Sequence, residues 1–107
     1  VLHAKLSTVR GIYAEIQKSI RVPGEGECYA DLVITVNKGK SSECIYLVEL
    51  KYAAKSRATS AFIEELKNEA VRQLTDYRTA LEFRDRQIRS YAMVFAGSVC
   101  VYCGQCC

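Results

Sequence analysis

The sequence predicts an α/β fold in which a mixed central sheet is flanked by helices. Two strongly apolar runs, residues 29–36 and 44–52, are separated by a polar segment typical of a hairpin turn. A helical pattern follows over residues 60–83, and another apolar run occupies residues 90–96. A strand that follows such a helical crossover returns parallel to a neighbour, so the sheet should contain both antiparallel and parallel pairs.

The first part of the chain predicts a helix over residues 2–20. Apolar residues recur there at alternating steps of four and three, which gives one apolar stripe on a helix: Leu2, Leu6, Val9, Tyr13, Ile16 and Ile20. A short strand is expected at residues 19–22, before a loop marked by proline and glycine. The expected order is therefore αβββαβ, a helix, three strands, a helix and a strand.

At 107 residues the chain is expected to form one domain, closed by a cysteine-rich tail at residues 98–107. The first residue is Val rather than Met, which suggests a fragment of a longer chain, with further domains or a homodimer as possible partners. No apolar run reaches eighteen residues and no signal-peptide pattern is present, so neither membrane association nor export is expected. An intracellular location, cytoplasmic or nuclear, is the expectation.

Charged residues stand at the ends of the two central runs. Asp31 lies near the start of the first run, and Glu49 and Lys51 lie near the end of the second. In an antiparallel hairpin the start of one strand lies beside the end of the next, so these three side chains should converge. Leu50 should point to the other face of the sheet. A solvated surface ion pair is the alternative interpretation.

Asp31 followed by Glu49-Leu50-Lys51 and then a helix resembles the PD-(D/E)XK nuclease superfamily, whose domains are restriction-endonuclease-like. The resemblance extends to Gln73 and Tyr77, which lie one turn apart on the following helix. Some branches of the family add a glutamate on the first helix, and Glu15 is the candidate here, although an ordinary surface position explains Glu15 at least as well. For Gln73 the alternative is a position at the edge of the helix stripe that reaches water.

The resemblance implies a metal-dependent nuclease that hydrolyses phosphodiester bonds, with DNA favoured as the substrate. It implies that Asp31, Glu49 and the backbone carbonyl of Leu50 bind Mg²⁺ or Mn²⁺, with Glu15 as a tentative further ligand. It assigns Lys51 to the attacking water or the phosphate charge. It assigns Gln73 and Tyr77 to positioning Lys51 or the scissile phosphate.

The distribution of charge gives modest support for a nucleic-acid partner. Residues 1–50 hold six basic and six acidic residues, whereas residues 51–107 hold nine basic and six acidic ones. Lys55, Arg57 and Arg72 are candidates for contacts with the nucleic-acid backbone because they are basic and near the acidic residues in sequence. An ordinary solvated helix surface accounts for the same bias equally well.

Cysteines are concentrated at the end of the chain. An iron–sulfur cluster bound through Cys100, Cys103 and Cys106 is one interpretation of their spacing. Disulfides are a second, and a reduced strand followed by a loose tail is the third and the favoured one.

Two other functions remain open at this stage. A catalytically silent module with a nuclease fold could bind nucleic acid or a protein partner. A structural or interaction domain would carry the acidic pair only incidentally, and its support is the uncharged end of the chain after residue 89.

Overall fold

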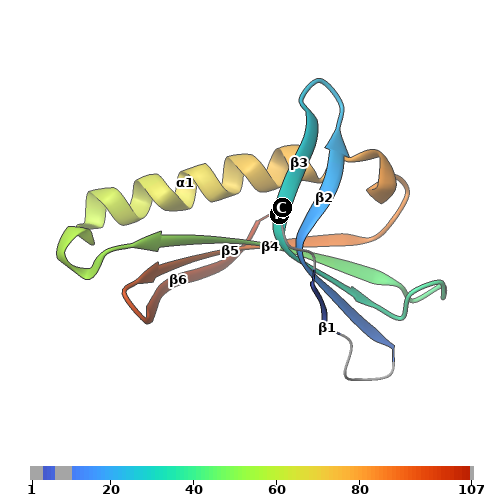
Figure 1. Ribbon diagram of the computed structural model, residues 1–107, viewed down its shortest axis with the longest axis horizontal. Helices are drawn as coiled ribbons and strands as arrows, with labels where there is room; N and C mark the ends of the chain where they lie inside the picture. Colours follow the sequence, from blue (N-terminus) through green and yellow to red (C-terminus); the bar gives the residue numbers. More distant parts are fainter. Residues whose placement is uncertain (1–3, 7–10, 107) are drawn as a thin grey trace.

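The computed structural model of the chain describes residues 4–6 and 11–106. A six-stranded sheet carries a single long helix, α1 (Ser60–Tyr77), across one face (Figure 1). Two short 3₁₀ turns, η1 (Lys55–Arg57) and η2 (Leu81–Phe83), lie before and after that helix. The strands, in spatial and chain order, are β1 (Ala4–Leu6), β2 (Ile12–Val22), β3 (Gly26–Val36), β4 (Cys44–Ala53), β5 (Ile88–Ala96) and β6 (Val99–Cys106).

The sheet is mixed, as the sequence predicts. The first four strands form an antiparallel meander, and β5 and β6 form an antiparallel hairpin. Between these parts α1 crosses over the sheet and returns the chain into β5, which runs parallel to β4. The α/β class with a mixed sheet is therefore confirmed.

The helix predicted over residues 2–20 is wrong. In its place the structure has β1 and the long strand β2, while residues 2, 3 and 7–10 lie outside the described part of the chain. The even-numbered positions of β2, from Ile12 to Val22, are mostly apolar and the odd-numbered ones are mostly polar. Alternation with a period of two is the pattern of a strand. It describes more of the residues of β2 than the helical spacing does, although some of these residues satisfy both patterns.

The core lies between the sheet and α1. Ala70, Leu74 and Tyr77 of the helix pack there against strand residues that include Ile45 and Leu47. The helix begins where the Thr59 side chain accepts a hydrogen bond from the Phe62 N–H at 3.2 Å, which satisfies one of its free amides. It ends at Tyr77 rather than near Phe83, because the chain turns into η2, whose Phe83 is also part of the core.

The opposite face of the sheet carries no helix in residues 4–6 and 11–106, although helices on both faces were expected. Leu50 and Tyr52 of β4 point to this side, which we call the helix-free face, and β5 places Met93 and Phe95 beside them. Its aromatic residues stack in pairs, Tyr52 with Phe95 among them. One side of the sheet is thus packed against α1, and the other is largely apolar and carries no helix of the described residues.

The favoured interpretation of the C-terminal end, a reduced strand followed by a loose tail, is right about a strand but places its end too early. Residues 99–106 form β6, which pairs with β5 from Ala96↔Val99 to Ser90↔Cys106. Cys107 lies outside the described residues. The apolar, β-branched sequence at the start of this segment fits the strand that completes the hairpin.

Candidate active site

The acidic residues meet where two central strands stop pairing. β3 and β4 are paired from Val36↔Cys44 to Leu32↔Val48, and the next opposed residues, Asp31 and Glu49, are no longer part of the ladder. Beyond this point, which we call the fork, β3 continues with β2 past the helix, whereas β4 stays with β5 (Figure 1). The fork opens the centre of the sheet beside two carboxylates.

Each carboxylate of the fork binds an amide of the other strand. The Asp31 N–H donates to Glu49 Oε1 at 3.2 Å, and the Leu50 N–H donates to Asp31 Oδ2 at 2.9 Å. The N–H and C=O of one strand residue point to the same side of the strand, so the Leu50 carbonyl also faces the fork. Two carboxylates and one main-chain carbonyl are thereby directed to one place.

Glu49 is in an environment that disfavours its negative charge. Its side chain belongs to the buried face of β4, and the residue is only 4 % exposed. Burial, followed by the charge of Asp31, raises the pKa of the Glu49 carboxyl to about 7. A cation at the fork would relieve this repulsion, because it would offset both negative charges.

Lys51 lies on the same face of β4 as Glu49 and reaches toward α1. Its Nζ is 3.0 Å from Glu69 Oε1 on that helix. This hydrogen bond and the positive charge of Lys51 lower the pKa of Glu69, so the carboxylate that holds the lysine remains ionised. The ion pair fixes the position of a lysine that would otherwise be flexible.

The helix brings Gln73 and Tyr77 to the same side of the sheet. Tyr77 is part of the core, where burial raises the pKa of its hydroxyl and the charge of Glu49 raises it further. The Oε1 of Gln73 is buried, and no hydrogen-bond partner for it exists within the described chain. Burying an acceptor without a partner lowers the stability of the folded state, and such an acceptor often binds a ligand or a water molecule.

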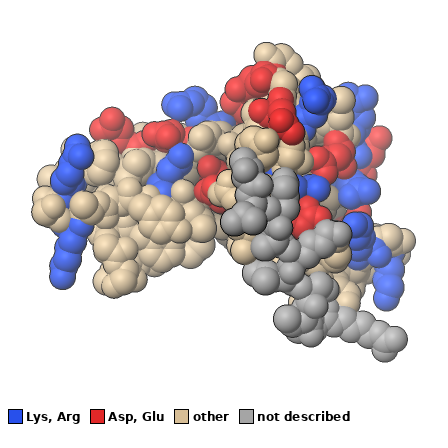
Figure 2. Space-filling model, in the orientation of Figure 1, with Lys and Arg blue, Asp and Glu red and all other residues tan. Residues whose placement is uncertain are grey.

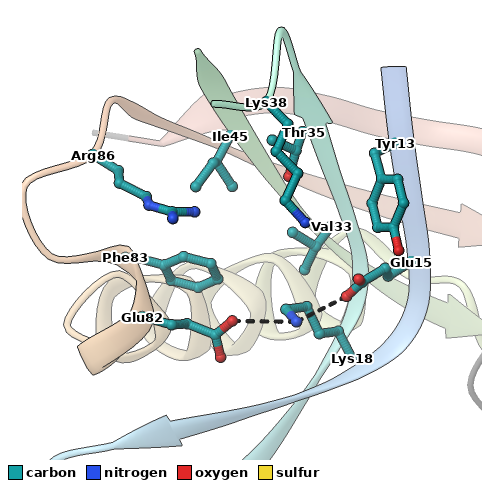
Figure 3. Close-up of a pocket in the computed structure, with 10 residues that line it drawn as sticks. All are labelled: Tyr13, Glu15, Lys18, Val33, Thr35, Lys38, Ile45, Glu82, Phe83 and Arg86. Atoms are coloured by element: carbon teal, nitrogen blue, oxygen red, sulfur yellow. Dashed lines mark ion pairs between the residues drawn. The ribbon is translucent and has the colours of Figure 1, made fainter. Parts of the chain in front are cut away.

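Glu15 does not join these residues. It lies on β2 opposite Val33, and its carboxylate is 2.8 Å from Lys18, which also pairs with Glu82 at 3.2 Å. Figure 3 shows Lys18 between the two glutamates, in a small pocket next to Phe83. The expectation that a first helix carries Glu15 to the site is wrong, because the segment is a strand and its glutamate has local partners.

Gln17 is a neighbour of the site that the sequence did not reveal. It stands opposite Asp31, between the pairs Ile16↔Leu32 and Lys18↔Ala30, and its Nε2 donates to Asp31 Oδ1 at 3.3 Å. Its φ of 55° is left-handed, which is unusual for a residue other than glycine. Its polar side chain opposite Asp31 is the one feature of the sequence that could have indicated this contact. That position follows from the sequence only if residues 12–22 are taken to be a strand.

The three basic candidates are exposed, two in η1 and one on α1. Lys55 and Arg57 belong to η1, directly after β4, and the Arg57 guanidinium is 5.5 Å from the centre of the Phe62 ring. Arg72 precedes Gln73 on the exposed side of α1. In Figure 2 basic residues are visible at the end of the molecule where β4 leads into α1.

The donors at the fork suit a hard divalent cation. The carboxylates of Asp31 and Glu49 and the Leu50 carbonyl are all oxygen ligands, which Mg²⁺ and Mn²⁺ prefer. The pKa of Glu49 is raised and the side-chain oxygen of Gln73 has no partner in the described residues, so both groups would be stabilised by a bound cation or water. No cluster of three or more His, Cys, Asp or Glu side chains with metal-binding geometry occurs in the described residues.

The C-terminal cysteines are distributed along β6. Cys103 is opposite Met93 and Cys106 is opposite Ser90, which places these two thiols on different faces of the sheet. Cys28, Cys44, Cys100 and Cys103 are free thiols. Their arrangement does not gather Cys100, Cys103 and Cys106 around one point, as an iron–sulfur cluster requires.

Comparisons with known proteins identify the family. The model of one protein family, the PD-(D/E)XK nuclease superfamily, matches residues 23–105, which include both strands of the fork, α1 and the β5–β6 hairpin except for its last residue. Comparisons with curated proteins and with solved structures find no match. Within the described residues no helix is long and apolar enough to cross a membrane. The match spans most of the sequence, and the chain therefore belongs to the PD-(D/E)XK nuclease superfamily.

Proposed function

We propose that the chain is a metal-dependent nuclease that hydrolyses phosphodiester bonds, with DNA favoured as substrate by its likeness to restriction-endonuclease-like domains. The observation that carries the proposal is the acidic pair at the fork, in which Glu49 is buried, Asp31 is half-buried, and each carboxylate accepts a hydrogen bond from the other strand. A silent binding module has no need to hold two carboxylates side by side with one of them buried, because their repulsion reduces stability.

Asp31, Glu49 and the Leu50 carbonyl are the proposed ligands of Mg²⁺ or Mn²⁺. When bound, the cation polarises the phosphate and lowers the pKa of a water molecule. Glu49 must be ionised to serve as a ligand, so binding should favour the state that burial disfavours in the free protein.

Lys51 is proposed to orient the attacking water or to stabilise the charge that develops on the phosphate. Glu69 holds the lysine Nζ at 3.0 Å, which supports a defined position for it. Gln73 is proposed to use its free oxygen toward Lys51 or the water, and Tyr77 to support this side of the site from the core. Lys55, Arg57 and Arg72 are proposed to contact the nucleic-acid backbone.

The test is a cleavage assay on matched DNA and RNA substrates in the presence of Mg²⁺ or Mn²⁺. Asp31→Ala and Lys51→Ala should each reduce cleavage at least about a hundredfold, because they remove a cation ligand and a charge needed in the transition state. Glu65→Ala and Lys40→Ala are matched controls, since both residues are exposed and lie outside the fork. Cleavage that persists in both site variants would refute the proposal.

A silent module that binds nucleic acid makes a different prediction. Calorimetry would then detect cation or nucleic-acid binding by the wild type, but no substrate would be cut with either metal. Absence of both cleavage and cation binding would favour an interaction domain instead.

A further inference from the structure

A hollow adjoins the acidic pair on the helix-free face. Its volume is about 410 Å³, and its walls are Ile16, Gln17, Asp31, Leu50 and Tyr52. Asp31 belongs both to this hollow and to the fork, so an occupant would be next to the proposed cation. The volume is in the range of small-molecule sites and is ample for one flat ring system.

Tyr52 provides an aromatic wall that is open to solvent. The residue is 65 % exposed, yet its ring is held by Phe95, with ring centres 5.5 Å apart and planes inclined by 20°. Exposed aromatic rings that are fixed in this way are good stacking platforms, because little freedom is lost when a second ring packs on them.

The other walls combine apolar surface with one amide. Ile16 and Leu50 are apolar, whereas Gln17 has a carboxamide, which can both donate and accept hydrogen bonds. Gln17 is held in its left-handed conformation opposite Asp31, and the hydrogen bond to Asp31 Oδ1 directs its amide toward the site. This environment suits a flat, uncharged ring whose edge carries hydrogen-bonding groups.

We propose that the hollow binds the base of a nucleotide adjoining the scissile phosphate, with the base unstacked from its neighbours and packed on Tyr52. The proposal rests on the proposed function, and it narrows the substrate to nucleic acid that is single-stranded or locally opened. A base inside a regular duplex is stacked on both sides and cannot enter such a site unless it is extruded.

A second copy of the chain is the competing occupant. Figure 2 shows a broad surface without charged residues over β5 and β6, which a partner molecule could cover. The position of the hollow favours a nucleotide, because Asp31 forms part of its wall and a phosphate at the fork would carry its own base into it.

The test measures whether the contributions of the base and of Tyr52 to DNA affinity depend on each other. Binding of a fluorescein-labelled single-stranded DNA is measured with Mg²⁺ in the Lys51→Ala background, which should leave the DNA uncut. Tyr52→Ala should weaken binding about tenfold or more, whereas Tyr52→Phe should retain it. A series of oligonucleotides, each lacking one base at a different position, is then compared. At one position the missing base should weaken DNA binding by the parent, but it should not weaken binding by Tyr52→Ala any further.

Tyr46→Ala is the matched control. Tyr46 lies on the same strand and also stacks on a neighbouring ring, that of Tyr91, but it does not line the hollow. It should therefore leave DNA affinity within about twofold of the parent, at a similar thermal stability.

The outcomes separate this inference from the proposed function. The base site is rejected if Tyr52→Ala binds DNA as tightly as the parent, or if Tyr52→Ala and Tyr46→Ala lose the same amount of DNA affinity. In either case cleavage by the wild type would still support the proposed function. Dependence on Tyr52 without cleavage by the wild type would retain the base site and reject the nuclease. A dimer in sedimentation that Tyr52→Ala converts to a monomer would assign the surface to a second copy and overturn the base site.

Discussion

Glu49 has a raised pKa, and its charge should make the free protein less stable at neutral pH than at acidic pH. Between pH 4.5 and about 7 the folded state retains a proton on Glu49 that the unfolded chain releases, so stability falls as the pH rises through this window. At pH 8 without metal, Glu49→Gln should therefore be more stable than the wild type by about 2 kcal/mol.

Urea denaturation of both proteins at pH 4.5 and pH 8 measures this difference. The two should be similar at pH 4.5, since a protonated glutamate and glutamine carry no charge. Mg²⁺ should stabilise the wild type at pH 8 and leave the variant unchanged. A wild type that gains stability from pH 4.5 to 8 relative to Glu49→Gln would show that the carboxyl is not destabilised by burial.

Gln17 combines an unfavourable backbone conformation with a contact to Asp31. Gln17→Gly and Gln17→Ala both remove the amide, but only glycine adopts a φ of 55° without steric cost. Gln17→Gly should therefore be more stable than Gln17→Ala by about 1 kcal/mol, measured by urea denaturation. Both should lose cleavage activity to the same degree, and unequal losses would mean that backbone position, not the amide, supports Asp31.

The sequence was sufficient to predict some of these residues and not others. Asp31, Glu49 and Lys51 could be predicted to lie close together because hairpin geometry links the start of one strand to the end of the next. The contact of Gln17 depends on a local left-handed residue, and that conformation leaves no clear pattern in the sequence.

At the level of secondary-structure elements, α1 carries Gln73, whose buried oxygen lowers the stability of the fold and therefore suggests a functional role. Replacing Gln73 by Leu removes a buried oxygen that has no partner in the described part of the chain, so stability should rise by about 1 kcal/mol. Cleavage should fall at least tenfold, because the amide is then missing from the site. Thermal unfolding and the cleavage assay measure the two effects.

Ser90 offers a control for this prediction. Its hydroxyl is also buried without a partner in the described residues, but Ser90 lies on β5 opposite Leu47 and is not one of the proposed ligands. Ser90→Ala should raise stability without lowering activity. If Gln73→Leu behaves in the same way, Gln73 has no part in catalysis.

The elements differ in how well they could be predicted. Strands β3, β4 and β5 are dense apolar runs, and the helix between them has a long apolar stripe and a capping threonine, so several signals agree. In β2 the spacing of Tyr13, Ile16 and Ile20 also satisfies a helical period. The choice between the two depends on pairing with β3, a long-range contact that local pattern does not contain.

For the whole molecule, the distribution of positive charge should determine the salt dependence of nucleic-acid binding. Replacing Lys55 and Arg57 together by Ala should weaken binding several-fold and reduce the slope of log Kd against log salt by about 1–2. The control replaces Lys40 and Arg84, which removes the same charge from turns that are not next to the end of β4. Equal effects of the two double variants would indicate a response to net charge alone.

The fork between β3 and β4 also gives the protein two spectroscopic probes of its own site. The amides of Asp31 and Leu50 donate to carboxylates rather than to the carbonyls of a neighbouring strand. When a cation draws electron density from those carboxylates, both amide protons should shift in an NMR spectrum, while the amides of Val33 and Leu47, within the paired region, should change little. Titration with Mg²⁺ would thus report occupation of the fork directly, before any substrate is known.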